Sequence, residues 1–116
     1  MKVSIKDQIG QRCIIKEDGQ KVYDTIHETL RNGETVTLDF KGVSQFAAPF
    51  FNFAIGQLLR DITEENLRSL LQIEGLNEAG CLVVERVIEN GAKYYGDENY
   101  RKIVDDVMER QAMESI

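Results

Sequence analysis

The sequence predicts an α/β sandwich, with a mixed β-sheet of about four strands and about four to five helices. Short segments rich in β-branched residues alternate with longer segments whose apolar residues recur every three or four positions. The 116 residues suffice for one hydrophobic core. An apolar content of 42% is ordinary for a folded protein and argues against disorder. We therefore expect a single domain over residues 1–116.

The first sixteen residues predict two short strands joined by a turn. "KVSIK" (2–6) alternates apolar and polar residues, so that Val3 and Ile5 share one face. "RCIIK" (12–16) follows Gly10 and reads as the second strand.

A helix and a longer strand are expected next. "EDGQKVYDTIHETLRNG" (17–33) has helical apolar spacing and ends in Asn32-Gly33, a helix stop signal. "ETVTLDF" (34–40) is the clearest strand because β-branched residues dominate it. Its apolar face consists of Val36, Leu38 and Phe40.

The middle of the chain predicts two helices and a strand. Proline suits the first position of a helix, so a helix is expected from Pro49 to about Arg60. "TEENLRSL" (63–70) predicts a short helix with Thr63 as its N-cap. "LLQIEGL" (70–76) predicts a short strand.

Two helices are expected at the C-terminal end. Asn77 is a suitable cap for a long helix that ends near Tyr95. A last helix is expected after Gly96-Asp97, with apolar residues at steps of three and four. Its apolar residues are Tyr100, Ile103, Val104, Val107 and Met108.

The charge distribution argues against a nucleic-acid-binding protein. The net charge is −6. Residues 1–46 carry seven basic and seven acidic side chains, whereas residues 47–116 carry seven basic and thirteen acidic ones. Binding of DNA or RNA needs a basic face that neutralises phosphates, and the sequence has no basic cluster. A partner protein with a basic surface fits better.

The sequence predicts a cytoplasmic protein that does not enter a membrane. No run approaches the ~20 apolar residues needed to span a bilayer, and "MKVSIKDQIG" lacks the apolar centre of a signal peptide. Cys13 and Cys81 lie far apart among apolar neighbours, so we expect both to be buried and reduced.

Residue types suited to catalysis are sparse, and we expect no cofactor or metal. His27 is the single histidine and is interpreted as a half-exposed surface residue. Asp39 lies in the clearest strand, where a carboxylate commonly bonds a neighbouring loop. The glycine spacings match no phosphate-binding fingerprint. An enzyme that uses Asp39 or His27 remains an alternative.

The strand–turn–helix junction "TLDFKGVSQFAAPFFNFAIGQLLRD" is the main candidate for a functional site, although its turn has no nucleophile, acid, base or metal ligand. At 100° per residue, one arc of the helix is apolar and should face the core. This arc consists of Phe50, Phe51, Ala54, Ile55, Leu58 and Leu59.

Phe53 falls on the opposite side of this helix, among polar residues and a glycine, as in an interaction patch. The partner-binding candidates are Ala48, Pro49, Asn52, Phe53, Gly56, Gln57 and Arg60. The alternative is that the N-terminal segment or the C-terminal helix covers Phe53.

The junction resembles the central strand–loop–helix of STAS domains, which include bacterial anti-sigma-factor antagonists. The similarity is greater to the STAS-like family of unknown function, through "LDF", "GV" and "FNFAIGQL". "LQIEGLNE" and "VERVIENGAKYY" extend the resemblance from about Thr35 to Tyr95. It implies a STAS-like sandwich in a bacterial protein that works by protein–protein contact. The implied partner is an ATPase- or kinase-like regulator, and a homodimer is one candidate assembly.

The resemblance also implies where a phosphorylation switch would lie. In the antagonists a loop serine at the start of the helix is phosphorylated. This serine belongs to an Asp-Ser-Ser-Gly type motif, whose Asp-Ser-Ser positions correspond here to Ala47, Ala48 and Pro49. Pro49 stands where the phosphorylated serine would be, and proline has neither a hydroxyl nor an N–H group. The general switch is therefore missing, and Ser44, the nearest hydroxyl, is a candidate substitute.

Two functions remain open from the sequence. The first is a non-enzymatic regulatory domain that acts by protein–protein interaction. The second is a small-molecule sensor, because several aromatic residues could line an apolar pocket at the junction. These residues are Phe46, Phe50, Phe53, Tyr94 and Tyr95.

Overall fold

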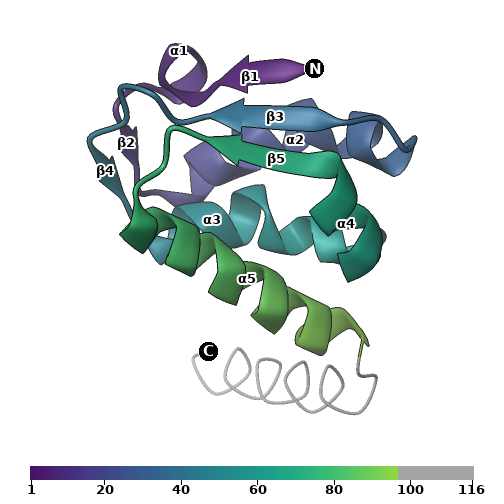
Figure 1. Cartoon of the computed structure of the whole chain (residues 1–116). Helices are drawn as coiled ribbons and strands as arrows, with labels where there is room; N and C mark the ends of the chain where they lie inside the picture. Colours follow the sequence, from purple (N-terminus) through teal and green to yellow (C-terminus); the bar gives the residue numbers. More distant parts are fainter. Residues whose placement is uncertain (97–116) are drawn as a thin grey trace, which may run out of the picture.

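A parallel three-stranded sheet forms the frame of the computed structural model, which describes residues 1–96 (Figure 1). The strands follow the order β1-β3-β5, so that β3 is central. A second parallel sheet pairs two very short strands, β2 and β4. The strands are β1 (Lys2–Ser4), β2 (Arg12–Cys13), β3 (Val36–Asp39), β4 (Gln45–Phe46) and β5 (Leu71–Glu74).

The expected α/β class is confirmed, but the expected mixed sheet of about four strands is wrong. All strand pairs within residues 1–96 are parallel, and they form two sheets. The expected strand over 2–6 ends at Ser4, whose hydroxyl accepts a hydrogen bond from the Asp7 N–H (3.3 Å) and caps helix α1 (Ile5–Ile9). Because α1 separates β1 from β2, these strands do not form a hairpin.

Strand β2 ends three residues earlier than the sequence predicted. Ile14 and Ile15 lie outside it and are exposed, and helix α2 (Lys16–Arg31) begins directly afterwards. Strand β4 was not predicted. A two-residue strand has too few positions for a recognisable alternation, so that tertiary pairing alone defines it.

The remaining helices largely confirm the sequence pattern. The expected helix from Pro49 to Arg60 is divided at Ile55 into an α-helix and a 3₁₀ segment. The expected helix after Gly96 lies outside the described residues. The elements are α3 (Ala48–Ala54), η1 (Gly56–Arg60), α4 (Glu64–Leu70) and α5 (Glu78–Gly96).

Two expected helix caps are confirmed. The Thr63 hydroxyl accepts a hydrogen bond from the Asn66 N–H (3.2 Å) at the start of α4. The Asn77 side chain accepts one from the Gly80 N–H (2.8 Å) in the first turn of α5. Within residues 1–96, no helix combines the length and the apolar character needed to cross a bilayer.

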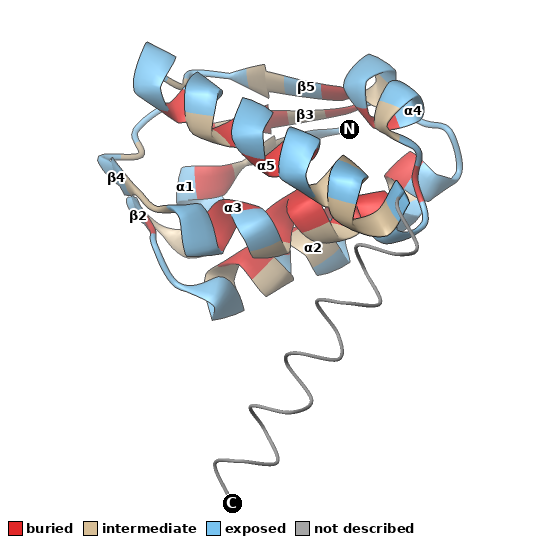
Figure 2. Ribbon diagram, turned by 90° about the horizontal axis from the view of Figure 1, so that it is seen from below, coloured by how far each residue is buried: buried red, intermediate tan, exposed pale blue. Residues whose placement is uncertain are grey.

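The three-stranded sheet has one apolar face and one polar face, and the residues of its central strand β3 point alternately to each. Leu38 is fully buried, and the parallel register places Val3 and Ile73 on either side of it. Neighbouring positions point to the other face, where Lys2 of β1 and Glu74 of β5 form an ion pair (3.3 Å). Helices α2, α3 and α5 gather on the apolar side (Figure 2).

Glycine allows α2 and α3 to approach closely. A Cβ atom placed on Gly19 of α2 would collide with the carbonyl oxygen of Phe50 and lie 2.9 Å from the Cβ atom of Phe53. Helix α5 approaches η1 in the same way, because a Cβ on Gly91 would lie 3.2 Å from the Gly56 carbonyl oxygen. These contacts set the position of α3 between α2 and α5.

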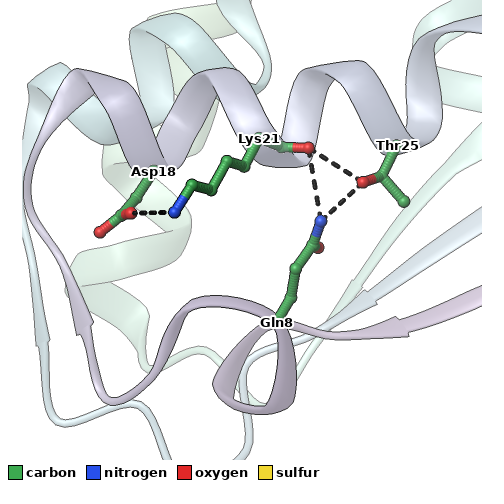
Figure 3. A network of polar contacts seen from close by, with 4 residues as sticks. All are labelled: Gln8, Asp18, Lys21 and Thr25. Carbon is green, nitrogen blue, oxygen red and sulfur yellow. Dashed lines mark hydrogen bonds and ion pairs between the residues drawn. The ribbon is translucent and has the colours of Figure 1, made fainter.

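Helix α1 is held against α2 by a small polar network (Figure 3). The Gln8 amide donates hydrogen bonds to the Thr25 hydroxyl (2.6 Å) and to the Lys21 carbonyl oxygen (3.3 Å). Lys21 also lies 3.8 Å from the Asp18 carboxylate. The network therefore anchors the segment between β1 and β2 on the middle of α2.

Replacement of Gly19 by alanine tests the close contact between α2 and α3. Alanine normally stabilises a helix interior by ~1 kcal/mol relative to glycine. Here we expect Gly19→Ala to lower the free energy of unfolding by about 1–3 kcal/mol through overpacking. Gly96→Ala is the control, since a Cβ there would meet no atom of residues 1–96 within 4 Å. Urea unfolding measures both, and an unchanged Gly19→Ala protein would contradict the packing.

The two cysteines differ, which corrects the expectation that both are buried. Cys13 is fully buried, and burial, together with the nearby Asp18 carboxylate, raises the pKa of its thiol to about 11. Cys81 is exposed on α5. Both are free thiols in the structure, as the sequence predicted.

Iodoacetamide at pH 8 should therefore modify Cys81 rapidly and leave Cys13 intact, since the thiolate is the reactive form. Mass spectrometry of the native protein should detect one modification, and unfolding in urea should add the second. Modification of Cys13 in the native state would show that the pairing of β2 with β4 opens readily.

Candidate functional site

The junction between β4 and α3 presents an apolar corner, defined by Ile14, Ile15, Ala48 and Pro49. The Ala47 N–H donates a hydrogen bond to the Cys13 carbonyl oxygen (2.9 Å), which extends the β2–β4 pairing and brings the two segments together. All four residues of the corner are exposed, and 51% of Ile15 is accessible to solvent. The apolar corner therefore lies at the N-terminal ends of both α2 and α3.

The inner face of α3 and η1 is the one that the sequence predicted. Five of its six apolar residues are fully buried, and Leu59 is 6% exposed. The ring of Phe51 lies at its centre, with ring centroids 5.8 Å from Phe40 and 5.9 Å from Phe46. This aromatic contact fixes the rotation of α3 and so determines which residues face outward.

The outer face differs in part from the expectation. Asn52 and Arg60 are exposed, whereas Phe53 is half-buried because α2 covers its Cβ atom at Gly19. Gly56 is buried, which corrects its expected place on the solvent side; it lies against Val87 of α5. The sequence pattern could not show this, because a helical wheel contains no neighbouring helix.

Gln57 connects elements within the domain. Its side-chain amide donates hydrogen bonds to the Gln20 side-chain oxygen of α2 (2.9 Å) and to the Phe53 carbonyl oxygen (2.8 Å). Because both hydrogen bonds are made within the protein, the Gln57 side chain stabilises the packing of η1 on α2.

A groove of about 580 Å³ runs between the outer face of α3 and η1 on one side and α5 on the other. We call it the α3–α5 groove. The candidate residues Asn52, Phe53, Gly56, Gln57 and Arg60 all contribute to it. On the opposite wall, the sequence predicted Tyr94 and Tyr95 as pocket-lining aromatic residues but did not indicate the other three, because no local pattern shows which face of α5 meets α3. This wall consists of Val87, Asn90, Gly91, Tyr94 and Tyr95.

Arg60 and Tyr95 meet at one end of the groove. The Arg60 guanidinium carbon lies 6.0 Å from the centre of the Tyr95 ring, a distance typical of cation–π contact. A hydrogen bond to Tyr95 raises the pKa of Arg60 above its ordinary value. The contact links η1 to the end of α5.

His27 has a partner that the sequence did not reveal. Its Nε2 atom lies 2.8 Å from Oδ2 of Asp61, at the end of η1, and its ring stacks on Tyr23 at 4.8 Å. Burial, and next the Asp61 carboxylate, raise the pKa of the Tyr23 phenol. This cluster connects α2 to η1, and the His27 imidazole and the Asp61 carboxylate contact each other.

Asp39 has the structural role that the sequence favoured. Its carboxylate accepts a hydrogen bond from the Lys41 N–H (3.0 Å) in the following turn. Ser44, the candidate substitute phosphoacceptor, is exposed, and its hydroxyl donates to the Gln11 carbonyl oxygen (3.3 Å). Within residues 1–96, no group of three or more histidine, cysteine or acidic side chains is arranged to hold a metal ion.

The expected pocket of five aromatic residues does not form as one site. Phe50 is fully buried, and Phe46 packs on Phe51 beside the core. Phe53, Tyr94 and Tyr95 lie together in the α3–α5 groove. The sequence grouped all five by their aromatic character, whereas the rotation of α3 separates them.

Comparisons with known proteins agree with the junction motif. A family described as the STAS-like domain of unknown function matches residues 18–80, which is more than half of the chain. This range includes β3, α3 with Ala48 and Pro49, β5 and most of α2, whereas Ile14 and Ile15 of the apolar corner precede it. Comparisons with curated proteins and with solved structures gave no match.

Two substitutions distinguish the internal role of Gln57 from the open position of Asn52. Gln57→Ala should lower the free energy of unfolding by about 1–2 kcal/mol, because two hydrogen bonds are lost. Asn52→Ala should change it by less than about 0.5 kcal/mol, as is usual for an exposed residue. Thermal and urea unfolding provide the comparison, and equal effects would refute the different roles of these neighbours.

Proposed function

The chain belongs to the family of STAS-like domains of unknown function, and we propose that it is a non-enzymatic, cytoplasmic regulatory domain that acts by binding another protein. The proposed contact surface comprises the apolar corner and the adjoining α3–α5 groove. Ala48, Pro49, Asn52, Phe53 and Arg60 are its accessible residues, while Gly56 and Gln57 support it from within the domain.

One observation carries this proposal: exposed apolar groups and a partly accessible aromatic ring follow one another along a single helix. Ala48 and Pro49 are exposed at the start of α3, and the partly accessible ring of Phe53 follows one turn later beside Tyr94. Aromatic residues with amides at their rim are characteristic of protein interfaces. The amides of Asn52 and Asn90 lie at the same groove.

The character of the partner follows from charge. A domain with a net charge of −6 attracts partners with a basic surface. The family resemblance favours an ATPase- or kinase-like regulator, and a second copy of the chain is the alternative.

The corner differs from a phosphorylation switch. Neither Ala47 nor Ile15, the N-cap residues of α3 and α2, provides a side-chain cap. The resemblance to the antagonists implies that Pro49 stands where their phosphoacceptor serine would be. Binding at this corner would therefore be constitutive, unless Ser44 substitutes as the modified residue.

A small-molecule sensor is the second candidate, favoured by the size of the groove. Ligand sites commonly measure ~300–1,000 Å³, and the α3–α5 groove falls within this range. Its three aromatic rings would contact a planar apolar ligand, while its amides would orient polar substituents.

Asn52→Arg tests the contact surface, because a long cation in the groove would obstruct a basic partner. Asn66→Arg is the matched control, since Asn66 is also an exposed helical asparagine but lies on α4. Each protein is used as bait in the native host, and captured proteins are quantified by mass spectrometry. A specific partner should bind wild type and Asn66→Arg equally and lose at least about tenfold with Asn52→Arg.

Native mass spectrometry of the purified protein separates the alternatives. A bound small molecule that Asn52→Arg releases would support the sensor. A dimer that Asn52→Arg dissociates would identify a second copy as the partner. Equal capture by both variants, without a ligand or a dimer, would refute the contact surface.

A further inference from the structure

Strand β5 forms one edge of the three-stranded sheet in the part of the chain that the structure describes. The Phe40 N–H donates to the Glu74 carbonyl oxygen (2.9 Å), so the backbone groups of Glu74 face β3. Because successive residues of a strand direct these groups to opposite sides, the N–H and C=O of Ile73 point away from β3. The outer edge thus offers backbone hydrogen-bonding groups to a further strand.

An apolar cleft of about 240 Å³ lies directly beside this edge, between β5 and α5. It exists because α5 packs on η1 and α3 rather than closely on β5 (Figure 1). Arg68 of α4 and Glu85 of α5 form an ion pair across it (2.7 Å). Its apolar lining consists of Leu71, Ile73, Cys81, Val84 and Ile88.

From this juxtaposition we propose that β5 and the cleft bind an extended segment of a partner protein, which adds a strand to the sheet. Alternate side chains of that segment would enter the cleft beside Ile73 and Val84. The others would lie on the polar face of the sheet near Glu74. Backbone hydrogen bonds would provide affinity and the cleft would provide selectivity, as in other strand-addition complexes.

Exposed glutamates near the cleft and the edge of β5 indicate that the added segment alternates apolar with basic residues. Glu74 and Glu85 retain 54% and 49% side-chain exposure although Lys2 and Arg68 contact them, and Glu78 and Glu89 are exposed on α5. A second copy of this chain would bring the same carboxylates together and would be repelled. Charge therefore favours a basic partner over self-pairing.

This site is separate from the contact surface proposed above. The cleft uses the side of α5 that carries Cys81, Val84 and Ile88, whereas the α3–α5 groove uses Val87 and Tyr94. Each proposal can therefore fail without the other.

The test uses the full chain and a fluorescein-labelled Lys-Val-Lys-Val-Lys-Val-Lys peptide, with fluorescence anisotropy as the readout. A peptide of the same composition, Lys-Lys-Val-Val-Val-Lys-Lys, is the control, because its valines cannot all share one face of a strand. The alternating peptide should bind at least about tenfold more tightly than this control. Equal binding would indicate charge attraction alone and overturn the proposal.

Cys81→Lys should weaken binding of the alternating peptide by about tenfold, since it places a cation at the cleft. Leu82→Lys is the matched control, because the adjacent Leu82 is 59% exposed and does not line the cleft; it should change binding by less than about threefold. Both variants replace exposed residues, so folding should be preserved, as thermal unfolding would verify.

Amide hydrogen exchange provides an independent measurement. The Ile73 N–H should become protected when the alternating peptide binds, while residues of the α3–α5 groove should not change. Protection at the groove instead of β5 would overturn the assignment. So would a concentration-dependent dimer, detected without peptide by sedimentation and abolished by Cys81→Lys, because it would assign the edge to a second copy.

Discussion

The close approach of three helices, made possible by glycine, is the contact on which the surface of this protein depends. Gly19 lets α2 lie against the backbone of α3, and Gly91 lets α5 lie against Gly56 of η1. Helix α3 is thereby held between two neighbours, with Phe51 turned into the core. The same packing opens the α3–α5 groove on one side of α5 and leaves the cleft beside β5 on the other.

The functional interpretation follows from the kinds of side chain that this arrangement leaves accessible. The accessible candidates on α3 are small, apolar or amide residues, while the acidic groups nearby, such as Asp39 and Asp61, are occupied with internal contacts. Such a surface favours recognition over chemistry. We propose that the apolar corner, the α3–α5 groove and the edge of β5 each bind another molecule.

The sequence predicted the candidate site in outline and misjudged its details. Helical periodicity identified the core face of α3 because burial repeats with the turn of the helix. It also placed Asn52 and Arg60 correctly on the outside. It failed at Gly56 and Gln57, because the first is buried by α5 and the second bonds to α2. Neither neighbour is visible in a local pattern, and the same holds for the partner of His27.

The sequence by itself determined the long elements, their caps and the family. These features depend on residues within one turn or one strand of each other, such as Thr63 with Asn66 or the alternation of Val36 and Leu38. Tertiary structure decided the pairing of β1 with β3, the two-residue sheet of β2 and β4, and the break at Ile55. These depend on contacts between distant segments, whose free energy no local stretch of residues encodes.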